Sequence, residues 1–213
     1  MKLNLNKLRI TLRNTLIDVW EYVIPIWKIS GLFKSIKSKK DLENFIQERS
    51  AHVTQTTLFG YLKTRIGVKY IAMIEDERFL KSINIAKWNI YVVALADCAF
   101  YVFSYLISEK NLKANDCEEI FLNIIEKEKS NGLSDEIYES GKKNFLQRIE
   151  KVNFQKYYLE EPFKESGEAL YYWSPIADEL KSLDKKIVLN SISLKWGLIK
   201  DEFKKITKNL NFN

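Results

Sequence analysis

Residues 90–107 read IYVVALADCAFYVFSYLI, and these 18 residues contain one charged side chain, Asp97. A run of this length and composition is long enough to cross a bilayer as a helix. Asp97 lies near its middle, however, where a carboxylate costs about 2.5–3.5 kcal/mol on membrane-insertion scales. We therefore expect residues 90–107 to form the central buried helix of a bundle, with a membrane span as the alternative.

A buried Asp97 needs a partner or a raised pKa, because an isolated carboxylate in an apolar interior is too costly to keep ionised. From the sequence, we expect the partner to be Arg49, Tyr61, Arg65 or Lys87.

Apolar residues also recur every three or four positions on both sides of this run, which predicts further helices. Ser38, with Asp41 three residues later, predicts the start of a helix that continues to about Gly67, although VTQTT at 53–57 is also typical of a strand. The acids at 75–77 suit the first turn of the helix that contains Asp97. Further helices are predicted at about 116–130 and 135–151 and near 168–173, and a long last one is predicted with Ser174 as its cap and Pro175 in its first turn.

Three prolines and seven glycines supply too little turn chemistry for an all-β fold of this length. The sequence therefore predicts an all-α fold: a single-domain helical bundle over residues 38–213 with a long C-terminal helix. That last helix carries two apolar stripes, and we expect it either to break near Gly197 or to project toward a partner. One stripe consists of Ile176, Leu180, Leu183, Ile187, Leu194 and Leu198, and the other of Val188, Ile192, Ile199, Phe203 and Ile206.

Residues 1–37 form a separate basic amphipathic N-terminal arm in this prediction. Its apolar stripe is Leu5, Leu8, Leu12, Leu16, Val19, Val23 and Ile26, and residues 1–40 hold nine Lys or Arg against two acids. Two interpretations stay open. The stripe packs on the body of the same protein, or residues 1–35 lie on an anionic membrane surface.

Composition excludes several kinds of site. One histidine and two cysteines cannot supply a Cys/His zinc site, so we expect no metal, and no glycine-rich motif for a nucleotide cofactor is present. The net charge is +6, and the basic residues are 28 lysines and 6 arginines. A codon bias toward A and T raises the lysine content without any partner, so nucleic acid is an unfavoured partner. Cys98 and Cys117 are expected to be free thiols in a reducing compartment, the cytoplasm.

The single histidine lies in SAHVTQTTLFGYLKTR, residues 50–65. Helical spacing brings Arg49 and His52 onto one strip with Gln55 beside it. Two interpretations stay open: a hydrogen-bonded histidine between helices, or a polar pocket in which Arg49 or Arg65 holds an anion and His52 moves a proton.

Three segments, ENFIQERSAHVTQTTLFGYLKTRIG (43–67), SINIAKW (82–88) and SPIADELKSLDKKIVLNSISLKW (174–196), resemble a family of uncharacterised bacterial proteins of similar length. Some members carry the label "esterase", but the nucleophile-elbow motif that would support it is missing here. The resemblance implies that the three segments assemble together. The candidate binding residues are then Arg49, Gln55, Arg65, Asn84, Lys87, Trp88, Asp178 and Asn190, with His52 among them.

The function that we expect is an interaction or scaffold protein in the cytoplasm, peripheral to the inner membrane if the arm binds lipid. Its contacts with an unknown protein partner would come from the last helix and an aromatic segment; a homodimer stays open. That segment holds Tyr157, Tyr158, Phe163, Tyr171, Tyr172 and Trp173. The alternative is a hydrolase in which His52 acts with Ser50 or a water and with Asp97.

Overall fold

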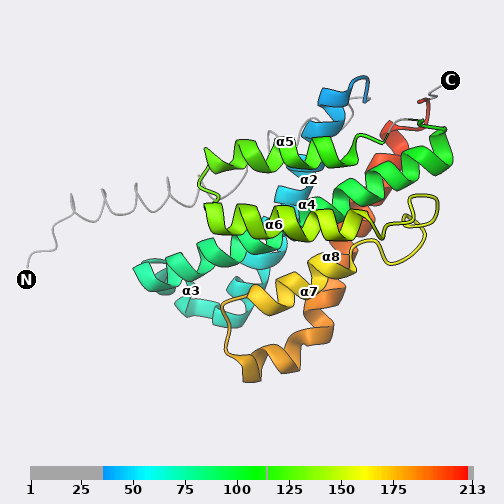
Figure 1. Cartoon of the computed structure of the whole chain (residues 1–213). Helices are drawn as coiled ribbons and strands as arrows, with labels where there is room; N and C mark the ends of the chain where they lie inside the picture. Colours follow the sequence, from blue (N-terminus) through cyan, green and yellow to red (C-terminus); the bar gives the residue numbers. More distant parts are fainter. Residues whose placement is uncertain (1–35, 114, 211–213) are drawn as a thin grey trace, which may run out of the picture.

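The computed structural model describes residues 36–113 and 115–210, and every regular element among them is helical (Figure 1). In chain order the elements are α2 (Lys39–Ile66), a 3₁₀ turn (Gly67–Lys69), α3 (Tyr70–Ile74), α4 (Glu77–Lys110), α5 (Cys117–Lys129), α6 (Asp135–Ile149), α7 (Lys164–Trp173) and α8 (Asp178–Ile206). The predicted all-α fold is confirmed, and VTQTT is helical. The predictions for residues 1–35 lie outside the described residues.

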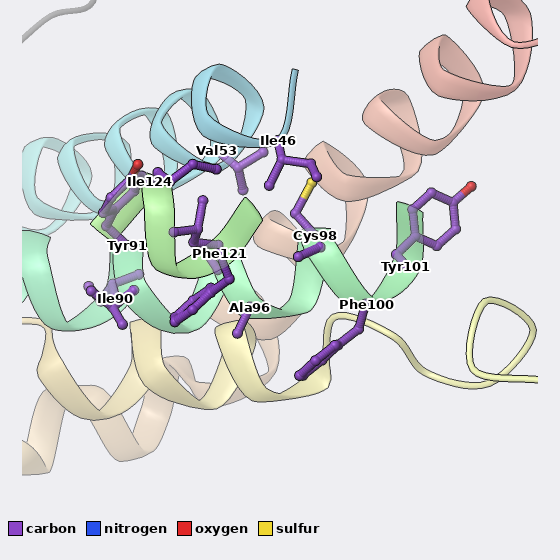
Figure 2. Close-up of a cluster of buried hydrophobic side chains, with 14 of the residues drawn as sticks. Ile46, Val53, Ile90, Tyr91, Ala96, Cys98, Phe100, Tyr101, Phe121 and Ile124 are labelled. Carbon is purple, nitrogen blue, oxygen red and sulfur yellow. The ribbon is translucent and has the colours of Figure 1, made fainter. Parts of the chain in front are cut away.

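Helix α4 is the central element of the bundle, because α2, α5, α6 and α7 all pack against it. Figure 2 shows Ile46 and Val53 of α2 and Phe121 and Ile124 of α5 over the side chains of α4. By length and composition α4 suits a membrane span, yet 83% of its most apolar 18-residue window is buried among the other helices. In this structure residues 90–107 are the core of the bundle.

The helix starts follow short-range signals in the sequence. The Ser38 hydroxyl accepts a hydrogen bond from the Asp41 backbone N–H at 3.1 Å, as predicted. The Asp76 carboxylate accepts one from the Phe79 N–H at 2.9 Å and caps α4. Helix α2 ends before Gly67, whose φ of 62° lies in the region that favours glycine.

The predicted start of the last helix is wrong. Helix α8 begins at Asp178, and Ser174 ends α7 instead, where its hydroxyl donates to the Leu170 carbonyl oxygen at 2.6 Å. Pro175 lies in the turn between the two helices. Helix α8 is 29 residues long and continuous through Gly197, so of the two alternatives for this helix the break does not occur.

Gly141 lies at a close approach of α6 to α4. A Cβ atom at Gly141 would lie 2.4 Å from Cγ1 of Val92, which is buried and β-branched and therefore has few rotamers into which it can move. Gly141→Ala is expected to lower the free energy of unfolding by about 1–3 kcal/mol. The gain of about 1 kcal/mol in helix propensity offsets only part of that loss. Chemical denaturation measures the difference.

Gly197→Ala is the matched control, since Gly197 is also helical but a Cβ atom added there would have no neighbour within 4 Å. It is expected to stabilise the protein by about 0.5–1 kcal/mol. Equal effects of the two substitutions would show that α6 and α4 are not in close contact at Gly141.

Candidate interaction surface

Arg49 joins α2 to α8 and does not face an open pocket. Its Nε and Nη2 donate to the two carboxylate oxygens of Glu202 at 2.7 and 2.5 Å, and its side chain is only 5% exposed. A guanidinium held by two parallel hydrogen bonds is neutralised by its partner. Arg49 therefore acts here as a link between helices.

Ser50 and His52 do not form a nucleophile and base pair. The Ser50 hydroxyl is fully buried and donates to the Ile46 carbonyl oxygen at 2.7 Å. Residues two apart on a helix point in nearly opposite directions, and His52 is only half-buried. Burial, and then the positive charges of Lys195 and Arg49, lower the pKa of His52 from its ordinary value. His52 thus lies near the charged side chains of Lys195 and Glu202 on α8 and apart from the Ser50 hydroxyl.

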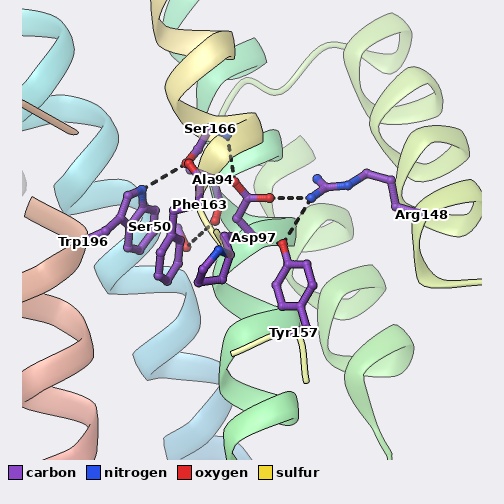
Figure 3. A network of polar contacts seen from close by, with 9 residues as sticks. Ser50, Ala94, Asp97, Arg148, Tyr157, Phe163, Ser166 and Trp196 are labelled. Atoms are coloured by element: carbon purple, nitrogen blue, oxygen red, sulfur yellow. Dashed lines mark hydrogen bonds and ion pairs between the residues drawn. The ribbon is translucent and has the colours of Figure 1, made fainter. Parts of the chain in front are cut away.

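Asp97 is paired with Arg148 of α6, so the expected partners Arg49, Tyr61, Arg65 and Lys87 were all wrong. Figure 3 shows the network. Nη2 of Arg148 donates to Oδ1 of Asp97 at 2.5 Å, and the Ser166 backbone N–H donates to Oδ2 at 2.7 Å. Burial raises the pKa of Asp97, although Arg148 and Ser166 pull that pKa down.

Trp196 extends this network to α8. Its indole N–H donates to the Ser166 hydroxyl at 3.0 Å, and its ring stacks on Phe163 with the centroids 4.2 Å apart. Four helices, α4, α6, α7 and α8, thus meet around Asp97. Both carboxylate oxygens of Asp97 already accept hydrogen bonds from the protein, so this network holds helices together.

The assembly that the resemblance implies is present only in part. Arg65 and Tyr61 of α2 bind Asp184 near the start of α8, with Nε of Arg65 2.7 Å and the Tyr61 hydroxyl 3.0 Å from its carboxylate. Burial and Asp184 raise the pKa of Tyr61 to about 12. This contact brings the first and third of the three resembling segments together.

The start of α4 faces a different neighbour. Lys87 lies over the ring of Trp88, and Trp88 packs edge-on against Tyr91, whose hydroxyl donates to Glu128 of α5 at 2.9 Å. These contacts of Lys87 and Trp88 are with other residues than the Asp184 carboxylate that Arg65 binds. Of the other candidates, Gln55 and Asn84 are half-buried, and Asp178 and Asn190 are exposed. Among the described residues no group of three or more His, Cys, Asp and Glu could hold a metal ion.

The feature of the described surface that stands out is a row of apolar side chains on α8. Leu180, Leu183, Ile187, Leu194 and Leu198 are 42%, 75%, 67%, 74% and 65% exposed. We call these five residues together with Asn190 the α8 seam. The second predicted stripe, including Val188, Ile192 and Phe203, is buried instead. Scattered exposed leucines are ordinary on protein surfaces, whereas a row of exposed aliphatic side chains along one helix face is not.

The spacing of the seam is that of a helix-pairing face. Leu180, Ile187 and Leu194 are seven residues apart, and Leu183 and Asn190 form a second series with the same spacing. Alternating steps of three and four residues define the a and d positions of a coiled coil. From Leu180 to Leu198 the seam is about 27 Å long at 1.5 Å per residue.

Two exposed aromatic residues lie beside the first turn of α8. Tyr172 and Trp173 at the end of α7 are 69% and 38% exposed, and Nζ of Lys181 donates to the Tyr172 carbonyl oxygen at 3.1 Å. Of the predicted aromatic segment, only these two side chains are exposed; Tyr157, Tyr158, Phe163 and Tyr171 pack against the core. Sequence reasoning had named the α8 stripe but could not tell that it was the exposed one.

Comparisons of the chain with protein-family models, with curated proteins and with solved structures give no match.

Proposed function

We propose that this protein is a non-catalytic interaction protein, a scaffold that binds a helix of its partner along the α8 seam. The observation that carries the proposal is the exposure of five aliphatic side chains along one helix, four of them at coiled-coil a and d positions and Leu198 beside the d position of Gly197. Burying such side chains contributes about 25 cal/mol for each Å² of apolar surface removed from water. The seam therefore offers a large gain in free energy to a partner that covers it.

The partner that fits best is a helix. The seam is a narrow a/d stripe, whereas a helix that lies in a membrane interface has a wide apolar face. Asn190 also interrupts the row near its middle, and its amide would be left without hydrogen bonds in lipid. Contact with an anionic membrane remains our proposal for the basic residues 1–35 only.

A hydrolase receives less support from the geometry. Nucleophilic catalysis needs a nucleophile and a base within hydrogen-bonding reach, with a third group that orients the base. Ser50 donates to a backbone carbonyl, and Asp97 is occupied by Arg148 and Ser166. The hydrolase alternative therefore stays a prediction from the sequence without an observation in its favour.

Cross-linking tests the proposal. The full-length tagged chain is expressed in its source cells, treated with a lysine-reactive cross-linker, purified, and analysed by quantitative mass spectrometry. We expect a partner in near-stoichiometric amount whose cross-links map to residues 178–205. In the variant Ile187→Glu/Leu194→Glu the yield should fall at least tenfold, because two carboxylates would be buried at the contact.

Leu159→Glu is the matched control, since Leu159 is 71% exposed and lies outside the seam. It should leave the yield unchanged. Equal yields from all three proteins would rule out the seam as the binding surface. Partition of the wild type, but not the seam variant, into anionic vesicles would identify the seam as a membrane contact and contradict the proposed helical partner.

A further inference from the structure

We infer that the helix bound at the α8 seam is α8 of a second copy of this chain, and that the two helices pair antiparallel about a two-fold axis near Asn190. The inference rests on the proposed function, because it identifies the partner of the same surface. Three features of the seam carry it: the positions of its apolar side chains, the place of Asn190, and the distribution of charge along α8.

The apolar positions are nearly symmetric about the middle of the seam. When two copies of α8 run in opposite directions about a point next to residue 189, Leu183 faces Leu194 of the second copy and Leu180 faces Leu198. An a position then meets a d position in the Leu183–Leu194 layer, as in antiparallel coiled coils. Each exposed aliphatic side chain near an end of the seam thus finds an aliphatic counterpart.

Asn190 lies near the second copy of Asn190 in this arrangement. Ile187 of the second copy is the residue directly opposite Asn190, and the two asparagines lie in adjacent layers, within one helical turn of each other. A side-chain amide carries both donors and acceptors, and two of them satisfy each other. A wholly apolar partner would leave the amide unpaired and buried. A single buried asparagine is also a known means of fixing the register of paired helices.

The charges of α8 favour opposite directions. Its first turn exposes Asp178 and Glu179, whereas Lys200, Lys204 and Lys205 lie in its last two turns. Asp178 already binds Lys181 at 2.9 Å, and Asp201 offsets one of the lysines, so Glu179 is the acid most available to the second copy. In this antiparallel register Glu179 lies nearest Lys200 of the second copy, and Lys204 and Lys205 lie beyond the acidic first turn. Parallel pairing would oppose lysine to lysine.

The first test is the oligomeric state of the purified full-length protein by sedimentation equilibrium. The wild type and Leu159→Glu should be dimers at micromolar concentration. Ile187→Glu/Leu194→Glu should be a monomer with an unchanged circular dichroism spectrum, and its dissociation constant should rise at least 100-fold. A monomeric wild type at 100 µM, or a seam variant that stays dimeric, overturns the inference.

The second test fixes the direction. A mixture of the single variants Leu183→Cys and Leu194→Cys should form a disulfide-linked heterodimer under mild oxidation, and neither variant alone should cross-link efficiently. The native Cys98 and Cys117 are fully buried, and burial raises the pKa of both thiols, so they do not compete. Efficient cross-linking of either variant alone would indicate parallel helices and overturn the antiparallel arrangement.

The two proposals fail in different ways. If the wild type is a monomer but another protein cross-links to residues 178–205 in a seam-dependent manner, the scaffold function stands and the self-pairing is wrong. If the wild type is a monomer with cross-links between residues 1–35 and the seam, the arm of the same chain covers the seam and both proposals fall.

Discussion

Arg148→Met is expected to lower the free energy of unfolding by about 3–5 kcal/mol at neutral pH, because it leaves the Asp97 carboxylate buried without its counter-ion. The Asp97 side chain is 0% exposed, and the guanidinium of Arg148 is the cation that it contacts, at 2.5 Å. The Ser166 N–H would remain as a hydrogen-bond donor but carries no full charge. Urea denaturation followed by circular dichroism measures the loss.

The effect should depend on pH in a defined direction. Burial already raises the pKa of Asp97 above its ordinary value, and loss of Arg148, which pulls that pKa down, raises it further. A carboxyl group whose pKa is higher in the folded state than in the unfolded state destabilises the fold above that raised pKa. The penalty disappears as the pH falls toward the ordinary value of 3.8. The deficit of Arg148→Met relative to the wild type should therefore shrink on acidification.

Two control variants separate charge from packing. The double variant Asp97→Asn/Arg148→Met should be more stable than Arg148→Met, because no buried charge remains at this position. The pH dependence that Asp97 gives to the deficit of Arg148→Met should also disappear. Lys185→Met removes an ion pair with Glu168 in which both side chains are more than 40% exposed, and it should cost less than about 1 kcal/mol. A loss for Arg148→Met no larger than that of Lys185→Met would contradict a buried ion pair at Asp97.

Trp196→Ala is the second substitution with a large expected effect, about 3–5 kcal/mol. The side chain is 1% exposed and lies between α8 and α7, where it stacks on Phe163 and donates to the Ser166 hydroxyl. Its removal would leave a cavity beside Ser166, whose backbone N–H donates to Asp97. Thermal and urea denaturation both report the loss.

Trp196→Phe should fall between the wild type and Trp196→Ala, since it keeps a ring but removes the indole donor, at about 1–2 kcal/mol. Trp173→Ala provides the matched control: the same residue type at the end of α7, but 38% exposed and outside the seam as defined. Its cost should stay below that of Trp196→Phe. A larger loss for Trp173→Ala than for Trp196→Ala would show that the contact between α7 and α8 is not packed as described.

Arg148→Met and Trp196→Ala act on one hydrogen-bond network, so their effects on the free energy of unfolding should not add. Trp196 reaches Asp97 through Ser166, and Arg148 reaches it directly. Side chains that share a hydrogen-bond network show coupling energies of about 0.5–3 kcal/mol in double-mutant cycles.

The ends of most helices were predictable because their signals are local. Ser38 and Asp76 cap the residues three positions after them, and Gly67 ends α2 through its own backbone conformation. The error at Ser174 has a local cause too. A serine before a proline is typical of a helix start, but the Ser174 hydroxyl bonds backwards to Leu170 and closes α7.

The candidate site was predicted less well because its members depend on contacts between distant residues. Asp97 was expected to pair with Arg49, Tyr61, Arg65 or Lys87, but it pairs with Arg148, whereas Arg49 and Arg65 pair with Glu202 and Asp184. No spacing in the sequence relates Asp97 to Arg148, which lies 51 residues later on another helix. The aromatic content of the buried α8 stripe, with Trp196 and Phe203, was the available hint as to which stripe faces the core.

Local sequence signals were enough to predict the helical fold of the described residues, where most of those helices begin and end, and that the run around Asp97 needs a charged partner. These properties depend on periodicity and capping, which act over a few residues. The packing of the helices was needed to identify Arg148 as that partner and to show that the Leu180–Leu198 row of α8 is exposed. Both follow from the way in which α6, α7 and α8 pack around α4, because burial is a property of the assembled core and not of any one helix.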